Sequence, residues 1–97
     1  MIRISKFEVD GKAGLGLQVG LPDSPPLVLL IGNKGFIMCG YLNIDTAEKL
    51  EVAAAVVTGV STVEDALNAE VKAATEEAKK NGVEVGMPGR EAIRRLL

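Results

Sequence analysis

The 97-residue chain contains no histidine and no tryptophan, and Cys39 is its only cysteine. Without histidine, a Ser-His-Asp triad, a Cys-His pair, a histidine-bearing zinc site and an imidazole pH switch are all excluded. A single cysteine also excludes a disulfide within the chain, which favours a reducing, cytoplasmic setting. We therefore expect neither a metal site nor a cofactor, and few routes to catalysis.

Aromatic residues are also few, and the chain has no excess of basic charge. Phe7, Phe36 and Tyr41 are the only aromatic side chains, and the formal net charge is -2. A nucleic-acid binder needs a basic surface or a row of stacking rings, so we expect no nucleic-acid partner. The longest apolar run, residues 27–31, is far shorter than the about 20 residues that cross a bilayer, and the N-terminus lacks the apolar core of a signal peptide. We expect a cytoplasmic protein with no membrane partner.

Two halves with different hydrophobic periods make up the chain. Residues 1–40 alternate apolar with polar or small residues around an Asp10-Gly11 turn signal, which is typical of strands joined by hairpins. Residues 41–97 show helical spacing, interrupted by one β-branched run at 56–60 that predicts an inserted strand. Because typical domains hold about 100–150 residues, we predict one compact α+β domain over residues 1–97.

Local signals place the strands of the first half. The apolar positions change parity near Ser5, which predicts a bulge. Prolines make residues 22–26 a loop, and the unbroken apolar run 27–31 predicts a strand that is buried on both faces. A Gly-Asn-Lys-Gly turn over residues 32–35 then leads into a strand over residues 36–39.

Capping signals place the helices of the second half. An acidic side chain three residues after a cap is the spacing of a capping box, and it predicts two short helices, capped by Asp45 and by Ser61. A longer helix is expected over residues 69–81, ended by Gly82 in the left-handed conformation. Pro88 fits the first turn of a last helix.

The stretch after the first turn alternates apolar residues with glycine. Glycine weakens a strand, so several together predict a close approach by another backbone or another subunit. A monomer of this size hides only about 60–65% of its unfolded surface, and the mean hydropathy is positive at +0.24. We therefore predict a homo-oligomer, either a dimer or a tetramer, that assembles through residues 1–40. The predicted contact residues are Ala13, Gly14, Leu15, Gly16, Leu17 and Val19.

Three segments resemble a known family. Residues 35–40, Gly-Phe-Ile-Met-Cys-Gly, resemble the Gly-Tyr-Ile-Met-Cys-Gly stretch of the YunC-like family, small bacterial and archaeal domains of unknown function. Residues 59–67 and 82–92 are similar to later parts of that family, so the likeness spans residues 35–97. The resemblance implies a small α/β domain whose N-terminal strands mediate oligomerisation as a tetramer. It implies no established reaction, substrate or cofactor.

Cys39 is the only thiol and hence a candidate nucleophile. A nucleophilic cysteine needs a nearby base, and in the absence of histidine its neighbours in sequence offer Lys34, Tyr41 or Asp45. The apolar run that ends at Cys39 is equally typical of a buried strand, in which an unreacted cysteine is a small core residue. The pattern favours the structural role and leaves the catalytic one open.

The start of the predicted last helix is the candidate binding site. Gly86, Met87, Gly89 and Arg90 would place free backbone amides and a guanidinium around one point, which suits a carboxylate or a phosphate. An ordinary loop-to-helix turn, with Arg90 paired to an acidic neighbour, has the same sequence pattern. The prediction is therefore a small anion at this turn.

Two hypotheses about function follow. The first and favoured one is a cytoplasmic, non-catalytic homo-oligomer that binds a small anion near Arg90. The alternative is a thiol-dependent enzyme that uses Cys39 in acyl or redox transfer. The reactivity of the thiol towards an alkylating probe in the folded protein separates the two.

Overall fold

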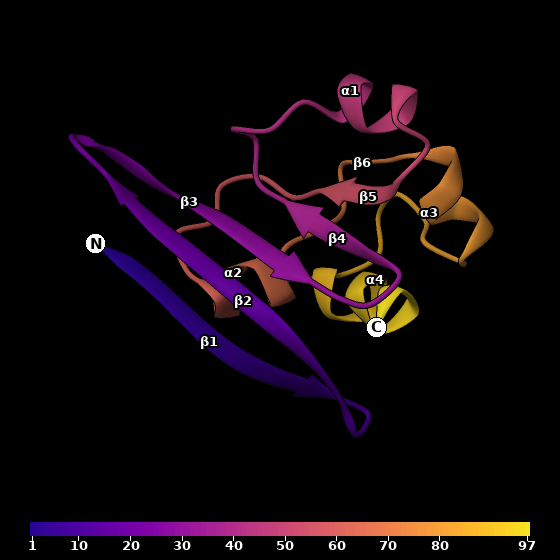
Figure 1. The fold of residues 1–97 in the computed structure, drawn as a ribbon, viewed down its shortest axis with the longest axis horizontal. Coiled ribbons are helices and arrows are strands. Elements are labelled where there is room, and N and C mark those ends of the chain that lie inside the picture. The colour runs from indigo at the N-terminus through magenta and orange to yellow at the C-terminus, as the bar shows by residue number, and fades with distance from the viewer.

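Six strands form one mixed sheet with short helices on both of its faces in the computed structural model, which describes residues 1–97 (Figure 1). The strands are β1 (Ile2–Val9), β2 (Lys12–Leu21), β3 (Ser24–Ile31), β4 (Gly35–Met38), β5 (Ala53–Val56) and β6 (Ala73–Ala74). The helices are α1 (Ile44–Lys49), α2 (Val63–Asn68), α3 (Glu76–Lys80) and α4 (Gly89–Leu96), and none of them has the length and apolarity to span a membrane. The predicted α+β fold is confirmed.

The sheet keeps the order of the chain from β1 to β6. The first four strands are antiparallel neighbours, and the predicted turn between β1 and β2 is confirmed. Asp10 and Gly11 both adopt a positive φ there (52° and 79°), as a two-residue type I′ hairpin requires. β4 and β5 are parallel and are connected through α1, so their carboxyl ends lie at the same end of the sheet.

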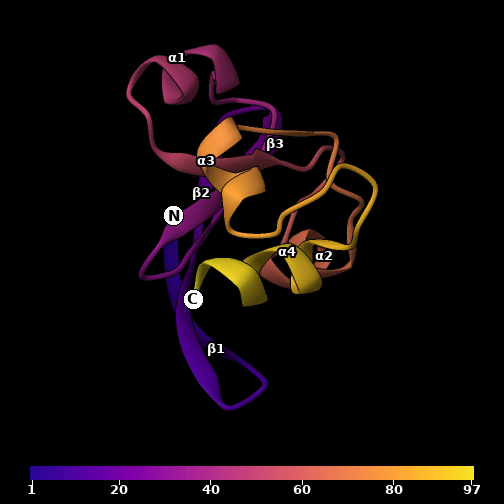
Figure 2. The same ribbon diagram turned by 90° about the vertical axis from the view of Figure 1, so that its right-hand side faces the viewer.

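The register assigns every side chain of the sheet to one of two faces. The inner face carries Val28, Leu30 and Ile37, which pack against α2 and α4 in the main core, whereas the outer face carries Leu17 and Leu29. Figure 2 shows α2 and α4 on one side of the sheet and α1 on the other. Because α1 packs near β4 and β5, no helix covers the outer face of β1 and β2 or most of that of β3.

β3 is buried on one face only, so the prediction of a strand buried on both faces is wrong. Leu30 on the inner face is fully buried, whereas Ile31 on the outer face is 38% exposed. The outer helix α1 has only six residues and lies over the parallel pair, which leaves most of β3 uncovered. The unbroken apolar run therefore combines one buried face with one apolar face that is open to solvent.

β1 also carries apolar residues on both faces. It pairs with β2 residue for residue along its whole length, so the predicted bulge near Ser5 is wrong. Ile4 lies on the outer face and is 68% exposed, while the ring of Phe7 lies on the inner face in the space left open by Gly14. The change in parity means that the apolar residues of β1 move from the outer face at Ile4 to the inner face at Phe7. The register between β1 and β2 does not change.

Of the loop predicted over residues 22–26, only Pro22 and Asp23 form a turn, and Pro25 and Pro26 lie in β3. The chain turns at Asp23, which adopts a positive φ of 51°, and β3 already begins at Ser24. Pro25 and Pro26 lie where the register between β2 and β3 shifts. Such an irregularity tolerates the missing amide donors of proline, which a regular ladder does not.

Only the end of the predicted helix over residues 69–81 is helical, as α3. Thr75 explains the break, because its buried hydroxyl donates to the carbonyl of Val52 (2.8 Å) and accepts from the amide of Ala54 (3.1 Å). The same hydroxyl accepts from the amide of Ala78 (3.2 Å) and so caps α3. Tertiary pairing with β5 holds the preceding residues extended and overrides their helical pattern.

The helix caps lie beside the predicted ones. α1 is capped by Asn43, whose side-chain oxygen accepts from the amide of Asp45 (2.8 Å), so the cap predicted at Asp45 is wrong by two residues. α2 is capped by Thr62, which accepts from the amide of Asp65 (3.0 Å), one residue after the predicted Ser61. Several neighbouring polar side chains can serve as a cap, and the geometry of the incoming chain selects among them.

α4 carries the best-paired carboxylate of the chain. The carboxylate of Glu91 accepts hydrogen bonds from the guanidinium groups of Arg94 and Arg95, and Arg94 also lies 3.5 Å from Asp10 at the β1–β2 turn. These hydrogen bonds, with that from Arg94 the largest cause, lower the pKa of Glu91 from 4.5 to about 2. The paired charges connect α4 to the tip of the first hairpin.

Glu91 should make the stability of the protein depend on pH in acid. The pKa of Glu91 is lower in the folded than in the unfolded chain. Its ionised carboxylate therefore contributes fully to the free energy of unfolding above about pH 4.5, and this contribution is lost as the pH falls towards 2. In the Glu91→Gln variant this ionisation is absent. The difference in unfolding free energy between wild type and variant, measured with urea, should therefore be largest near neutral pH and shrink in acid. A difference that stays the same at every pH would contradict this assignment.

Candidate functional site

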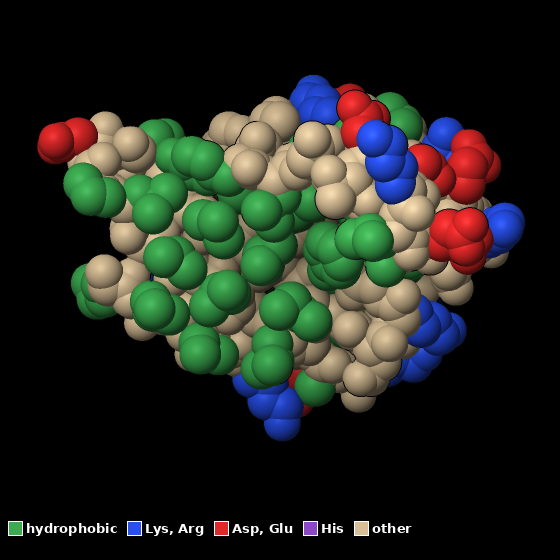
Figure 3. Space-filling model, turned by 45° about the horizontal axis from the view of Figure 1, so that its top comes forward, with side chains coloured by type: hydrophobic (Ala, Val, Ile, Leu, Met, Phe, Trp, Pro, Cys, Tyr) green, Lys and Arg blue, Asp and Glu red, His purple; other side chains and the backbone are tan.

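The outer face of β1, β2 and β3 is an open apolar surface. Ile4, Leu17 and Leu29 lie side by side across the three strands, and Leu15 and Ile31 are neighbours in the next row. Figure 3 shows a broad field of hydrophobic side chains on the molecule, with charged side chains around its rim. We call this surface the outer apolar face. Its residues are Ile2, Ile4, Leu15, Leu17, Val19, Leu27, Leu29 and Ile31.

The outer apolar face has the size of an interaction surface. Strands advance about 3.3 Å per residue and lie about 4.8 Å apart. Eight residues on each of three strands therefore cover a flat area of roughly 380 Å². The largest apolar patch on a typical monomer is about 300–600 Å² and is often functional, so this face has the size at which binding surfaces occur.

The glycines of β2 point away from this surface. A Cβ atom added at Gly16 would lie 2.6 Å from the Cγ2 of Val63 in α2, and one added at Gly14 would lie 2.8 Å from the Cδ2 of Leu97. The close approach predicted at these glycines is thus made by the chain's own C-terminal half, and Gly14 and Gly16 are not on the outer apolar face. The other four predicted contact residues lie on the outer side of β2: Ala13, Leu15, Leu17 and Val19.

A cavity of about 390 Å³ opens at the carboxyl ends of the parallel strands. Residues 39–41 follow β4 and residues 58–61 follow β5, and Pro25 and Pro26 at the start of β3 complete the wall. We call it the strand-end cavity. The strand predicted over residues 56–60 is therefore mostly a cavity loop, since β5 ends at Val56. No charged side chain lines this cavity.

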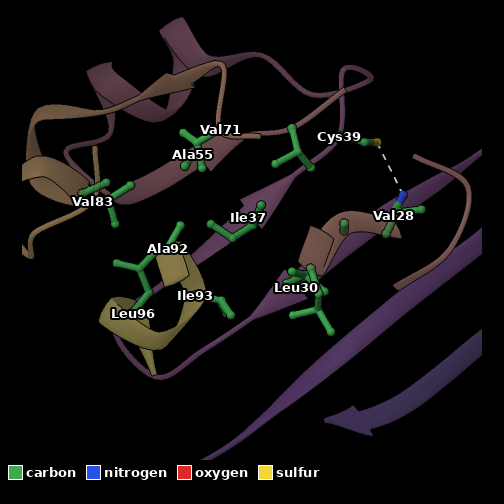
Figure 4. Packing of buried hydrophobic residues seen from close by; sticks show 14 of the residues in the cluster. Val28, Leu30, Ile37, Cys39, Ala55, Val71, Val83, Ala92, Ile93 and Leu96 are labelled. Carbon is green, nitrogen blue, oxygen red and sulfur yellow. Dashed lines mark hydrogen bonds between the residues drawn. The ribbon is translucent and has the colours of Figure 1, made fainter. Parts of the chain in front are cut away.

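Cys39 borders the strand-end cavity but is almost entirely buried. Its side chain is 4% exposed, and its Sγ accepts a hydrogen bond from the amide of Val28 at 3.4 Å. Figure 4 shows this contact at the edge of the main core, next to the buried side chains of β3 and β4. The thiol thus has one side in the core and one side on the cavity wall.

The side chains proposed as bases for Cys39 are dispersed. Only Tyr41 borders the same cavity, and its hydroxyl donates to the carbonyl of Pro25 at 2.8 Å. Lys34 lines a separate hollow at the opposite end of β4, and Asp45 lies in the first turn of α1. The structure therefore brings neither a carboxylate nor a lysine into the cavity with the thiol.

The turn over residues 86–90 uses its polar groups within the chain. The amides of Gly86, Met87 and Gly89 donate to backbone carbonyls at 2.9, 3.3 and 2.7 Å. The guanidinium of Arg90 lies 3.4 Å from the carboxylate of Glu64. The turn does not border the strand-end cavity. A small anion at this turn stays a prediction, and these contacts do not favour it.

The strand-end cavity is the feature that sequence reasoning missed. Its walls come from residues 25–26, 39–41 and 58–61, which no local motif connects. A signal did exist, because a helix-spaced segment between two short apolar strands is the pattern of a parallel pair. The ends of such a pair meet at one edge of the sheet, where ligand sites commonly lie.

The fold and these surfaces together define a small α+β domain with one mixed sheet, an open apolar face and an uncharged cavity. The family described as "Domain of unknown function (DUF1805)" matches residues 38–96. The chain belongs to the DUF1805 family.

Two relatives match the chain along its whole length. It is 30% identical over 101 residues to the uncharacterized protein YunC of Bacillus subtilis (strain 168), a match that spans 100% of this chain and 99% of that protein. It is also similar to a solved structure, the crystal structure of a protein of unknown function, TA1206, from Thermoplasma acidophilum. That likeness has a TM-score of 0.93 and 38% sequence identity, and covers 100% of this chain and 94% of the other. The resemblance to the YunC-like family is confirmed.

Proposed function

We propose that the protein is a non-catalytic, cytoplasmic homo-oligomeric module that assembles through its outer apolar face. The observation that carries this proposal is the apolar surface of three strands, whose central row consists of Ile4, which is 68% exposed, and the half-buried Leu17 and Leu29. Burying such a surface is the main favourable contribution to protein association. The chain holds no helix that could fold back over it.

A second copy of the same chain fits this surface best. The centre of the face is apolar and carries no charge, so two copies related by a two-fold axis can press the same patch together without opposing like charges. Two sheets that pack face to face lie about 10 Å apart, with their side chains interdigitated, as in a sandwich. A strongly charged partner would find no complementary group at the centre of this face.

The free edge of β1 supports a higher assembly. β1 is an eight-residue strand at the edge of the sheet, whereas β6 at the opposite edge has only two residues. A long edge strand offers unpaired amides and carbonyls to another strand. Face packing combined with edge pairing of β1 would join two dimers, in agreement with the tetramer that the family resemblance implies.

The thiol-dependent enzyme is the weaker proposal. Cys39 is nearly inaccessible, and its sulfur accepts a backbone hydrogen bond. Tyr41 is the only other ionisable side chain at the cavity. A cysteine nucleophile is normally activated by a base or a cation, and this cavity contains neither. These contacts favour the core role of the residue.

The mass of the native protein tests the proposed assembly. Native mass spectrometry and light scattering at micromolar concentration should report a dimer or a tetramer of the 10.2 kDa chain. A monodisperse 10.2 kDa species at these concentrations would overturn the proposal.

A further inference from the structure

We propose that the strand-end cavity binds a small, uncharged molecule that carries a carbonyl-type oxygen, held by backbone amides of the loops after β4 and β5. This inference is separate from self-association, because the cavity is lined by residues outside the outer apolar face. Its volume of about 390 Å³ lies at the small end of the range of ligand pockets, about 300–1,000 Å³.

The position of the cavity in the fold points to a ligand site. In sheets with parallel strands, ligands bind outside the carboxyl ends of the strands, because the loops there diverge and leave a crevice. β4 and β5 are the only parallel pair in this sheet, and the cavity lies at their carboxyl ends. The hydrogen bond from Tyr41 to the carbonyl of Pro25 joins the loop after β4 to the start of β3 and holds one wall in place.

The two loops that line the cavity contain backbone amides that make no hydrogen bond within the chain. They are those of Gly40, Tyr41, Thr58, Gly59 and Val60. The first four residues are exposed, so water can pair their amides, whereas Val60 is only 5% exposed, and buried amides in folded proteins are nearly always paired. The amides of residues 58–60 are consecutive in the loop after β5.

The backbone at Gly59 shapes this row of donors. It adopts a positive φ of 71°, and a Cβ added there would meet nothing within 4 Å. Glycine is thus required at this position for its conformation and not for space. The left-handed residue bends the loop after β5 where that loop lines the cavity.

The walls determine the charge of the ligand. The lining contains no lysine, arginine, aspartate or glutamate, so a charged ligand would be desolvated without a counter-charge. The carboxylate of Asp65, in the first turn of α2, accepts from the amide of Ser61 in the cavity wall at 3.1 Å and would oppose an anion. Apolar walls from Pro25, Pro26 and Val60 with neutral donors match a neutral ring or chain that bears an amide, ester or lactone oxygen.

Amide chemical shifts test the site in the full-length protein. We would titrate isotope-labelled protein with δ-valerolactam as the neutral carbonyl probe, with cyclopentanecarboxylate as an anion of similar size, and with cyclopentane-methanol as a neutral alcohol. The lactam should shift the amide signals of residues 40–41 and 58–60 and saturate in the millimolar range. The carboxylate should bind at least about tenfold more weakly, a difference of 1.4 kcal/mol.

Substitutions at Gly40 and at an exposed residue outside the cavity provide the test and its control. A Cβ added at Gly40 has its closest contact at 3.9 Å, with the Cγ2 of Thr58, so the side chain of Gly40→Leu can extend into the cavity, where it should abolish the lactam shifts. Glu84→Leu, at an exposed position that does not line the cavity, should fold and bind as the wild type does. Lactam should also slow the alkylation of Cys39 by iodoacetamide in the wild type, a measurement that does not depend on how the variants fold.

Three results would overturn the inference. One is the absence of lactam shifts at residues 58–60 in the wild type. Another is lactam shifts that persist in a folded Gly40→Leu variant. The third is tighter binding of the carboxylate than of the lactam, which would make this a site for anions.

Discussion

Leu17→Asp should convert the assembled protein into a monomer. Leu17 lies between Ile4 and Leu29 at the centre of the outer apolar face, so a carboxylate there would be buried against apolar side chains of the second copy. A buried charge without a partner costs several kcal/mol, and each 1.4 kcal/mol weakens association tenfold. The dissociation constant measured by analytical ultracentrifugation should therefore rise at least about a hundredfold.

An exposed valine provides the control for this experiment. Val85 is 57% exposed in the segment between α3 and α4, the helix that covers the inner face, so Val85→Asp should keep the wild-type mass. The Leu17 variant should also retain its circular dichroism spectrum, because the new side chain points to solvent in the monomer. Equal masses for wild type and the Leu17 variant would show that this face is not the interface.

Gly89→Ala should destabilise the fold more than any other single-methyl addition among the chain's glycines. A Cβ at Gly89 would lie 2.0 Å from the carbonyl oxygen of Ala66, the closest such contact in the chain. That atom belongs to the backbone of α2, so relief requires the two helices to move apart. Overpacking of this kind costs about 1–3 kcal/mol or more, and for a chain of this size 1 kcal/mol corresponds to about 4–8 °C in Tm.

The same chemical change at Gly40 serves as the comparison. Gly40→Ala adds a methyl group in ordinary contact, and it should change the unfolding free energy by no more than about 0.5 kcal/mol. Calorimetry of the two variants beside the wild type measures the difference. Comparable melting temperatures for Gly89→Ala and Gly40→Ala would contradict the helix packing described for α4 and α2.

Gly89 also shows why the candidate sites were harder to predict than the fold. A glycine-rich turn before a helix is typical both of an anion site and of a close contact between helices. The sequence shows the absence of a side chain, but it does not show what occupies the vacated space. Here that space is occupied by the carbonyl of Ala66, and the amide of Gly89 donates to Ala69.

Periodic patterns predicted the elements better than they predicted burial. The alternation of β2 divides its residues into two sets, but it does not say which set faces the core. The glycine side of β2 is the buried one, because Val63 and Leu97 fill the space above Gly16 and Gly14. The apolar side is left outside, which reverses the usual pattern of a half-buried strand.

By itself, the sequence determined the α+β class, the hairpin at Asp10-Gly11 and the exclusion of histidine chemistry. Each of these depends on residue type or on local spacing, which a single chain displays directly. Only the tertiary structure decided which face of the sheet stays open and that residues 25–26, 39–41 and 58–61 share one cavity. Both depend on parallel pairing and on where short helices lie, and these contacts join segments that are distant in sequence.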